Sequence, residues 1–239
     1  MNIKTIAAYA VHLFTASGLI LSFLSLLAVI NGRFMEAFMY NGAAVLIDSF
    51  DGILARHADV KKYASQIDGA LMDNIIDFIT FTLMPALFFV YAPLMLSENI
   101  KIVTVSALLL SSIFQFSNTN AKTKDHFFLG FPSYWNVAAL YLWVWQLPGS
   151  MNAIIIWLLA FLSFVPIKFI YPSRLDFFSN KVWLRQTFFV ATIMWGIATF
   201  AMLVLYPNIP VWLNGYVIAY MLWYTLVSLQ KTFSHRSKN

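Results

Sequence analysis

The chain alternates between long apolar runs and short polar breaks. We expect eight apolar runs of about 17–25 residues, each long enough to cross a bilayer as a helix. They cover approximately 6–30, 34–56, 66–91, 101–118, 132–147, 151–171, 184–206 and 210–230. Gly and Pro separate them, as in Asn31-Gly32 and Pro148-Gly149. Lipid offers backbone N–H and C=O groups no partners, so these runs predict an all-α, polytopic membrane bundle.

The composition supports a membrane protein. Hydrophobic residues make up 61% of the 239 positions and charged residues only 10%, which is more apolar surface than a soluble domain requires. With no cysteine, a disulfide, a thiolate nucleophile and a Cys-based metal site are all excluded. The first apolar run shows no clear cleavage site, so we interpret it as a first span and not as a signal peptide. We expect one membrane domain over 1–239.

The basic residues gather on one predicted side of the membrane. If the N-terminus is cytoplasmic, 13 of the 15 Lys and Arg residues fall in cytoplasmic segments, and only Arg33 and Lys101 lie opposite. The cytoplasmic set is Lys4, Arg56, Lys61, Lys62, Lys122, Lys124, Lys168, Arg174, Lys181, Arg185, Lys231, Arg236 and Lys238. This bias predicts that both termini and the loop between spans two and three face the cytoplasm.

That loop is flanked by an unusual group of aspartates. Six of the ten acidic residues lie between Asp48 and Asp77, although carboxylates are costly at membrane depth. Residues three and four apart share a helix face, so two facing stripes are expected at the junction of spans two and three. They are Asp48, Asp51, Gly52 and Ala55 on one helix, and Gly69, Asp73 and Asp77 on the other. Small residues in such stripes allow a helix or a ligand to approach closely.

Two further acids in this segment have local interpretations. Asp59 fits a solvated loop charge. Ser65 and Asp68 have the spacing of a capping box at the start of span three.

Four carboxylates converging in a low-dielectric cleft repel one another and resist joint ionisation. Divalent cations remove this difficulty, since oxygen ligands suit Mg²⁺, Mn²⁺ or Ca²⁺, and paired metals assist phosphoryl transfer. The alternatives are a buried network of Asp with Arg or Lys, and a path for protons or ions. The network needs more nearby cations than the sequence supplies. A cation-coupled transporter would favour polar segments repeated in two halves, whereas these acids lie in one early hairpin.

The motif resembles the signature of the CDP-alcohol phosphatidyltransferase family. It reads Asp48-x-x-Asp51-Gly52-x-x-Ala55-Arg56, twelve residues, then Gly69-x-x-x-Asp73-x-x-x-Asp77. The resemblance implies that two divalent cations, Mn²⁺ or Mg²⁺, bind Asp48, Asp51, Asp73 and Asp77, with Asp77 also the favoured general base. It implies that Gly52, Ala55 and Gly69 pack beside the cytidine nucleotide and that Arg56 contacts phosphate. The implied reaction is attack of an alcohol on a CDP-linked donor, with release of CMP.

The resemblance leaves the acceptor alcohol open among choline, serine, inositol and glycerol phosphate. The long spacer and the polar segment near 116–136 resemble family members that transfer phosphatidyl from CDP-diacylglycerol to free choline. A quaternary ammonium is best held by aromatic faces. Tyr134 and Trp135 are therefore candidate contacts for choline, with Phe131 beside them and Asn118 as a polar headgroup contact, although interfacial and capping roles also fit these residues.

Some other polar residues have open roles. Asn120 and Asn136 suit either a hydroxyl contact or a helix end, and Lys122 and Lys124 suit either the donor headgroup or solvent. We expect His12 to be a satisfied core group. The resemblance further implies a multi-pass enzyme of the bacterial inner membrane, its site facing the cytoplasm, and allows a homodimer. No feature of the sequence indicates nucleic-acid binding.

Overall fold

The computed structural model describes residues 2–93, 95–123, 125, 127–171, 175, 179 and 181–236. Lys124 and Arg174, counted above as cytoplasmic cations, lie outside these ranges, as does Lys238. The helices are α1 (Ile3–Ile30), α2 (Phe34–His57), α3 (Val60–Tyr63), α4 (Gly69–Asp77), the π-helix η1 (Phe78–Leu83), α5 (Met84–Tyr91), α6 (Glu98–Ser117), α7 (Trp135–Trp145), α8 (Gly149–Leu162), α9 (Val182–Leu205) and α10 (Val211–Arg236), and the strands are β1 (Phe127–Leu129) and β2 (Lys168–Ile170).

Four helical segments in the described ranges are long and apolar enough to cross a membrane. They are Ile3–Ile30, Gly69–Tyr91, Glu98–Ser117 and Val182–Leu205. Large apolar side chains remain exposed on them, such as Leu13, Leu110 and Phe200. Such surfaces are stable in hydrocarbon and costly in water. The chain is therefore a helical membrane protein.

The fifth and sixth predicted spans are shorter than expected. Helix α7 has 11 residues and α8 has 14. At about 1.5 Å per residue, neither crosses a hydrocarbon core of about 30 Å unaided. The predicted span 151–171 was wrong at its end, because α8 stops at Leu162 and Pro166 follows, which lacks the N–H that a continuing helix requires.

A small sheet takes the place of the missing helical turns. Strands β1 and β2 pair antiparallel, with Phe128 opposite Phe169. The prediction of a purely α-helical chain was therefore wrong here. Gly130 follows β1 with a φ of +81°, and a Cβ at this position would lie 2.4 Å from the carbonyl oxygen of Ser163. Only glycine allows the strand to pass the end of α8 so closely.

Helix α10 completes the outer edge of this sheet. The N–H of Lys168 donates to Thr232 Oγ1 at 2.8 Å, and the N–H of Ile170 donates to Ser228 Oγ at 3.4 Å. The Tyr224 hydroxyl donates to the Ile170 carbonyl at 2.8 Å. These three α10 residues are spaced by four and share one helix face. An otherwise unpaired strand edge is thus satisfied by side chains.

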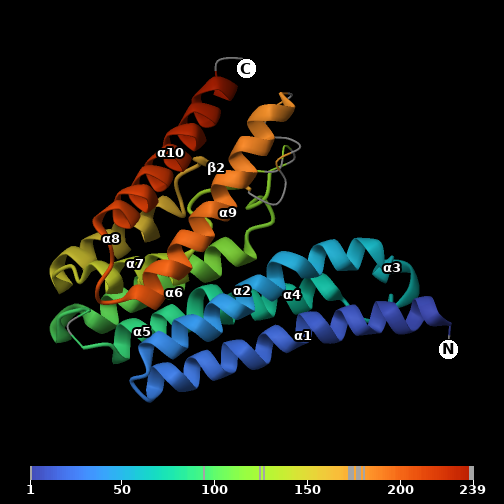
Figure 1. Cartoon of the computed structure of the whole chain (residues 1–239), viewed down its shortest axis with the longest axis horizontal. Helices are drawn as coiled ribbons and strands as arrows, with labels where there is room; N and C mark the ends of the chain where they lie inside the picture. The colour runs from blue at the N-terminus through green and yellow to red at the C-terminus, as the bar shows by residue number, and fades with distance from the viewer. Residues whose placement is uncertain are drawn as a thin grey trace.

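In Figure 1, α1, α2 and α4 lie together in one half of the molecule, and α9 and α10 rise beside one another in the other. Between them lies the main apolar core, which includes Met84, Phe88, Trp135 and Met202. Helices α1 and α2 approach closely because Ala28 and Ala37 are small and fully buried. The Ser25 hydroxyl donates to the Ala37 carbonyl across this contact at 2.7 Å.

The connection from α2 to α4 sets where the second acidic stripe begins. Asp59 is exposed, as expected. Asp68 is itself the N-cap of α4, and its Oδ1 accepts from the N–H groups of Ala70 at 3.1 Å and Leu71 at 3.0 Å. The predicted capping box was therefore wrong, because the helix begins at Gly69 and Asp68 holds the cap position instead of the third helical position.

Candidate active site

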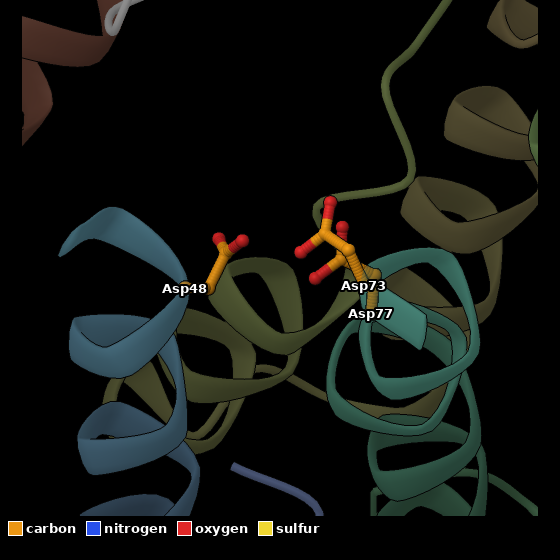
Figure 2. A group of neighbouring side chains, drawn as sticks. All are labelled: Asp48, Asp73 and Asp77. Carbon is orange, nitrogen blue, oxygen red and sulfur yellow. The ribbon is translucent and has the colours of Figure 1, made fainter. Parts of the chain in front are cut away.

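Three of the predicted carboxylates meet between α2 and α4. Asp48, Asp73 and Asp77 each offer an oxygen, and these oxygens all lie within 4.8 Å of one another. Figure 2 shows the Asp48 carboxylate on α2 facing the side chains of Asp73 and Asp77 on α4. Of the two stripes inferred from helical spacing, these three acidic members face each other. All three side chains are half-buried, so their mutual repulsion is only partly screened by solvent.

Asp51 lies at the same site but deeper. It is 8% exposed and lines the pocket that holds the other three aspartates. Thr15 and Gly18 of α1 line this pocket as well, which the sequence reasoning missed. The signal was available, because His12, Thr15, Gly18 and Ser22 recur every three or four residues and are buried on one face of α1.

A π-helix follows Asp77 directly. Inside η1, the Thr80 carbonyl accepts from Asn41 Nδ2 at 2.8 Å, and the Thr80 hydroxyl pairs with that of Ser22 at 2.6 Å. Asn136 Nδ2 in turn donates to Asn41 Oδ1 at 3.0 Å. These bonds satisfy polar groups of the widened turn and fix the end of α4 against α1, α2 and α7. Asn136 is therefore part of a buried structural network.

The small motif residues are placed unequally around the acids. A Cβ on Gly69 would lie 3.0 Å from His12 Cε1, so this position is tight, whereas one on Gly52 would meet only Arg56 Nη1, at 3.5 Å. The Arg56 side chain thus folds back over Gly52. Ala55 packs on the small cluster of α1 and α3 residues that includes Ala8.

His12 differs from its predicted description as a satisfied core group. It is 5% exposed, and its Nε2 has no hydrogen-bond partner among the residues that the structure describes. It lies against Gly69 at the first turn of α4.

The residues predicted to contact the choline headgroup lie in different places. Tyr134 is half-buried and packs on Phe81 of η1, with 6.2 Å between the ring centroids. Trp135 is fully buried in the main core, 5.0 Å from Phe131 between ring centroids, and does not line the pocket of the acids. Asn118 caps α6, and its Oδ1 accepts from the N–H of Asn120 at 2.9 Å. Trp135 and Asn118 thus have local structural contacts.

Lys122 lies near the acids although the sequence left its role open. Its ammonium is close enough to influence the charges of Asp48, Asp73 and Asp77. The Lys122 ammonium alone does not balance four carboxylates. An oxygen-only donor set of this net charge fits a hard divalent cation, so the cluster could bind one.

Comparison with known proteins agrees with this geometry. The model of the CDP-alcohol phosphatidyltransferase family matches residues 8–165, which include all four aspartates. Phosphatidylcholine synthase of Legionella bozemanae is 35% identical over 209 residues, covering 87% of this chain and 96% of that protein. The phosphatidylcholine synthase of Pseudomonas aeruginosa is 34% identical over 90% of this chain and 91% of its own, and that of Borreliella burgdorferi is 41% identical over 72% and 74%. With a matched motif, a facing set of carboxylates and similarity over most of its length, the chain belongs to the CDP-alcohol phosphatidyltransferase family of enzymes.

Proposed function

We propose that this enzyme transfers the phosphatidyl group of CDP-diacylglycerol to the hydroxyl of choline, giving phosphatidylcholine and CMP. The observation that carries the proposal is the convergence of Asp48, Asp73 and Asp77, in a chain similar to phosphatidylcholine synthases over most of its length. Similarity to phosphatidylcholine synthases supports choline as the acceptor, and the cluster of aspartates supports transfer of the phosphatidyl group.

The four aspartates would bind the metal cations, and one of them would accept the proton of the acceptor alcohol. Asp48, Asp51, Asp73 and Asp77 would hold two divalent cations, Mn²⁺ or Mg²⁺, which offset the negative charge of the diphosphate when bound. Asp77 accepts the proton of the choline hydroxyl. The choline oxygen forms a bond to the phosphorus that carries diacylglycerol, and the bond from that phosphorus to the CMP oxygen breaks. Arg56, folded over Gly52, contacts the phosphate of the nucleotide. The family resemblance implies that Ala55 and Gly69 are close-packing positions beside the nucleotide, and the space at Gly69 is bounded by His12 of α1.

The predicted topology supports a site that faces the cytoplasm of a bacterial inner membrane. The bias of Lys and Arg puts both termini and the α2–α4 connection on that side, with eight spans in one domain over 1–239. Helices α7 and α8, short as they are, would cross together with the non-helical segments that flank them. The acyl chains of the donor remain in lipid while choline enters from water. The family resemblance alone supports a homodimer.

The direct test is an acceptor competition with the full-length protein in lipid nanodiscs. CDP-diacylglycerol and Mn²⁺ or Mg²⁺ are supplied with labelled choline, serine, inositol or glycerol phosphate, each separately. We expect CMP release and labelled lipid with choline alone. Labelled lipid with serine but not choline would overturn the acceptor, and absence of CMP release with every alcohol, together with cation flux in liposomes, would overturn the reaction.

A further inference from the structure

Four aromatic rings run in a continuous chain from the acidic cluster to the small sheet. Phe81 lies in η1, one turn after Asp77, and its ring centroid is 6.2 Å from that of Tyr134. Tyr134 is 6.2 Å from Phe128, with the rings nearly perpendicular. Phe128 is 4.5 Å from Tyr171, with the rings inclined at 42°. Phe128, Tyr134 and Tyr171 are all half-buried, so none of the three is enclosed in the core.

The sheet determines which ring faces this side. Successive strand residues point to opposite faces, so Phe127 and Phe128 diverge. Phe127 is buried with Ile170 and Phe188 in a separate apolar cluster. Phe128 is left to form a corner with Tyr134 and Tyr171, which we call the aromatic corner.

A cation already lies on the aromatic corner. The ammonium nitrogen of Lys122 is 5.9 Å from the ring centroid of Phe128 and 5.7 Å from that of Tyr171. Distances under about 6 Å are typical of a cation–π contact. The isolated bridge between Lys122 and Phe128 holds the backbone of Lys122 beside these rings. The corner therefore already accommodates a positive group on two of its ring faces.

The aromatic corner is also next to the acids. Phe81, four residues after Asp77 in the adjoining π-helix, lies 6.2 Å from Tyr134 between ring centroids. The chain of rings thus begins one helical turn from Asp77, the proposed proton acceptor.

We propose that the aromatic corner of Phe128, Tyr134 and Tyr171 binds the quaternary ammonium of the acceptor, in the place where the Lys122 ammonium lies. This inference rests on the proposed function and assigns the acceptor's cationic end to residues of the sheet. A trimethylammonium cannot donate an N–H hydrogen bond, so ring faces recognise it where carboxylates or carbonyls would favour a primary amine. When the acceptor binds, Lys122 leaves the rings, and the anionic diphosphate of the donor provides its partner.

The test compares single-ring variants in the full-length enzyme. For Phe128→Leu and Tyr171→Leu, we expect the KM for choline to rise about 2- to 30-fold, which is the range for the loss of one cation–π contact. The KM for CDP-diacylglycerol is expected to stay within about twofold of wild type by the same energy scale. Wild type is expected to prefer choline to N,N-dimethylethanolamine and ethanolamine in that order, and the two variants to lose much of this preference.

A matched control comes from an aromatic pair on the lipid-facing surface. Phe114 and Phe164 are 4.7 Å apart and both half exposed. Phe114→Leu removes a ring of the same kind, and its KM for choline is expected to match wild type. Tyr171→Phe keeps the ring and is expected to retain choline affinity, which separates ring recognition from a loss of folding.

Lys122→Met gives the second, independent readout. We expect an unchanged or lower KM for choline, because a competing cation is removed, and a higher KM for CDP-diacylglycerol. The inference is overturned if wild type uses choline while Phe128→Leu and Tyr171→Leu behave like Phe114→Leu, or if Lys122→Met raises the KM for choline. If wild type makes no phosphatidylcholine at all, the proposed function itself fails, so the two failures are distinct.

Discussion

The acidic cluster and the edge of the small sheet are two ways of placing polar groups in an apolar chain. At the sheet edge, the N–H groups of Lys168 and Ile170 and the carbonyl of Ile170 each have a hydroxyl partner from α10. The Lys168 ammonium also pairs with Asp125 at 2.6 Å. In the cluster, like charges from α2 and α4 face one another.

The comparison distinguishes polar groups that stabilise the fold from polar groups that serve the reaction. A buried polar group with a partner contributes modestly to folding, and removal of the partner is costly. Grouped carboxylates oppose folding until a cation or a proton compensates them. The polar groups of the sheet edge are therefore satisfied within the fold, whereas the cluster could hold a cation. Variants in the acidic cluster are therefore expected to lower mainly turnover, and variants at the sheet edge mainly the free energy of unfolding.

The largest effect is expected from Asp77→Asn. Loss of the proton acceptor and of one ligand is expected to lower kcat by about 10³-fold or more. The Tm of the metal-free protein is expected to be unchanged or raised, because one of several repelling charges is gone. The exposed Asp59→Asn serves as control, and turnover of Asp77→Asn near that of Asp59→Asn would contradict the role of Asp77.

Metal removal tests the same region without a mutation. Chelation with EDTA is expected to abolish CMP release, and Mn²⁺ or Mg²⁺ is expected to restore it. Added metal is expected to raise the Tm of wild type, since a ligand that binds only the folded state stabilises it. This rise is expected to shrink in Asp73→Asn, and full activity in EDTA would refute the assignment of the cluster as a metal site.

A moderate effect is expected from Thr232→Val at the sheet edge. The N–H of Lys168 loses its partner, which is expected to lower the free energy of unfolding by about 1–3 kcal/mol. The chemical step is expected to change little, and the KM for choline to rise because Phe128 and Tyr171 are held by this sheet. Thr225→Val, at an exposed α10 position, is the matched control. Equal stability of the two variants would show that α10 does not hold the sheet.

The smallest effect is expected from Asp125→Asn, in the loop before β1. Burial raises the pKa of Asp125, but hydrogen bonds from Lys168 and Thr123 outweigh it and leave the pKa below its usual value of 3.8. Because the folded-state pKa is lowered, the contribution to stability is present above pH 3.8 and is lost as the pH falls through the folded value. The carboxylate is partly exposed, so salt is expected to weaken the effect. Thermal unfolding of both proteins from pH 7 downward measures it, and a Tm difference that persists at low pH would exclude the ion pair as its cause.

The acidic site could be predicted because it is local. Asp48 and Asp77 belong to one hairpin, where helical spacing and a short connection determine which side chains face each other. The sheet could not, since its strands have only three residues and are about forty positions apart, one in a predicted loop and the other at the end of a predicted span. Neighbouring helical residues point about 100° apart, so the sequence could not decide that Tyr134 would pack on Phe81 and Phe128 while Trp135 entered the core.

One consequence of the sheet concerns how such an enzyme evolves. The family match ends at residue 165, whereas β2, Tyr171 and the hydroxyls of α10 lie beyond it. The acids, Phe128 and Tyr134 thus lie within the part of the chain that matches the family. Tyr171, the third residue of the aromatic corner, lies in the C-terminal segment beyond it. Under the acceptor proposal, exchange of that segment between relatives would alter which alcohol is used while the reaction stays the same. Because one part of the chain would carry out the reaction and another would select the alcohol, a single ancestral enzyme would give rise to enzymes that make different lipids.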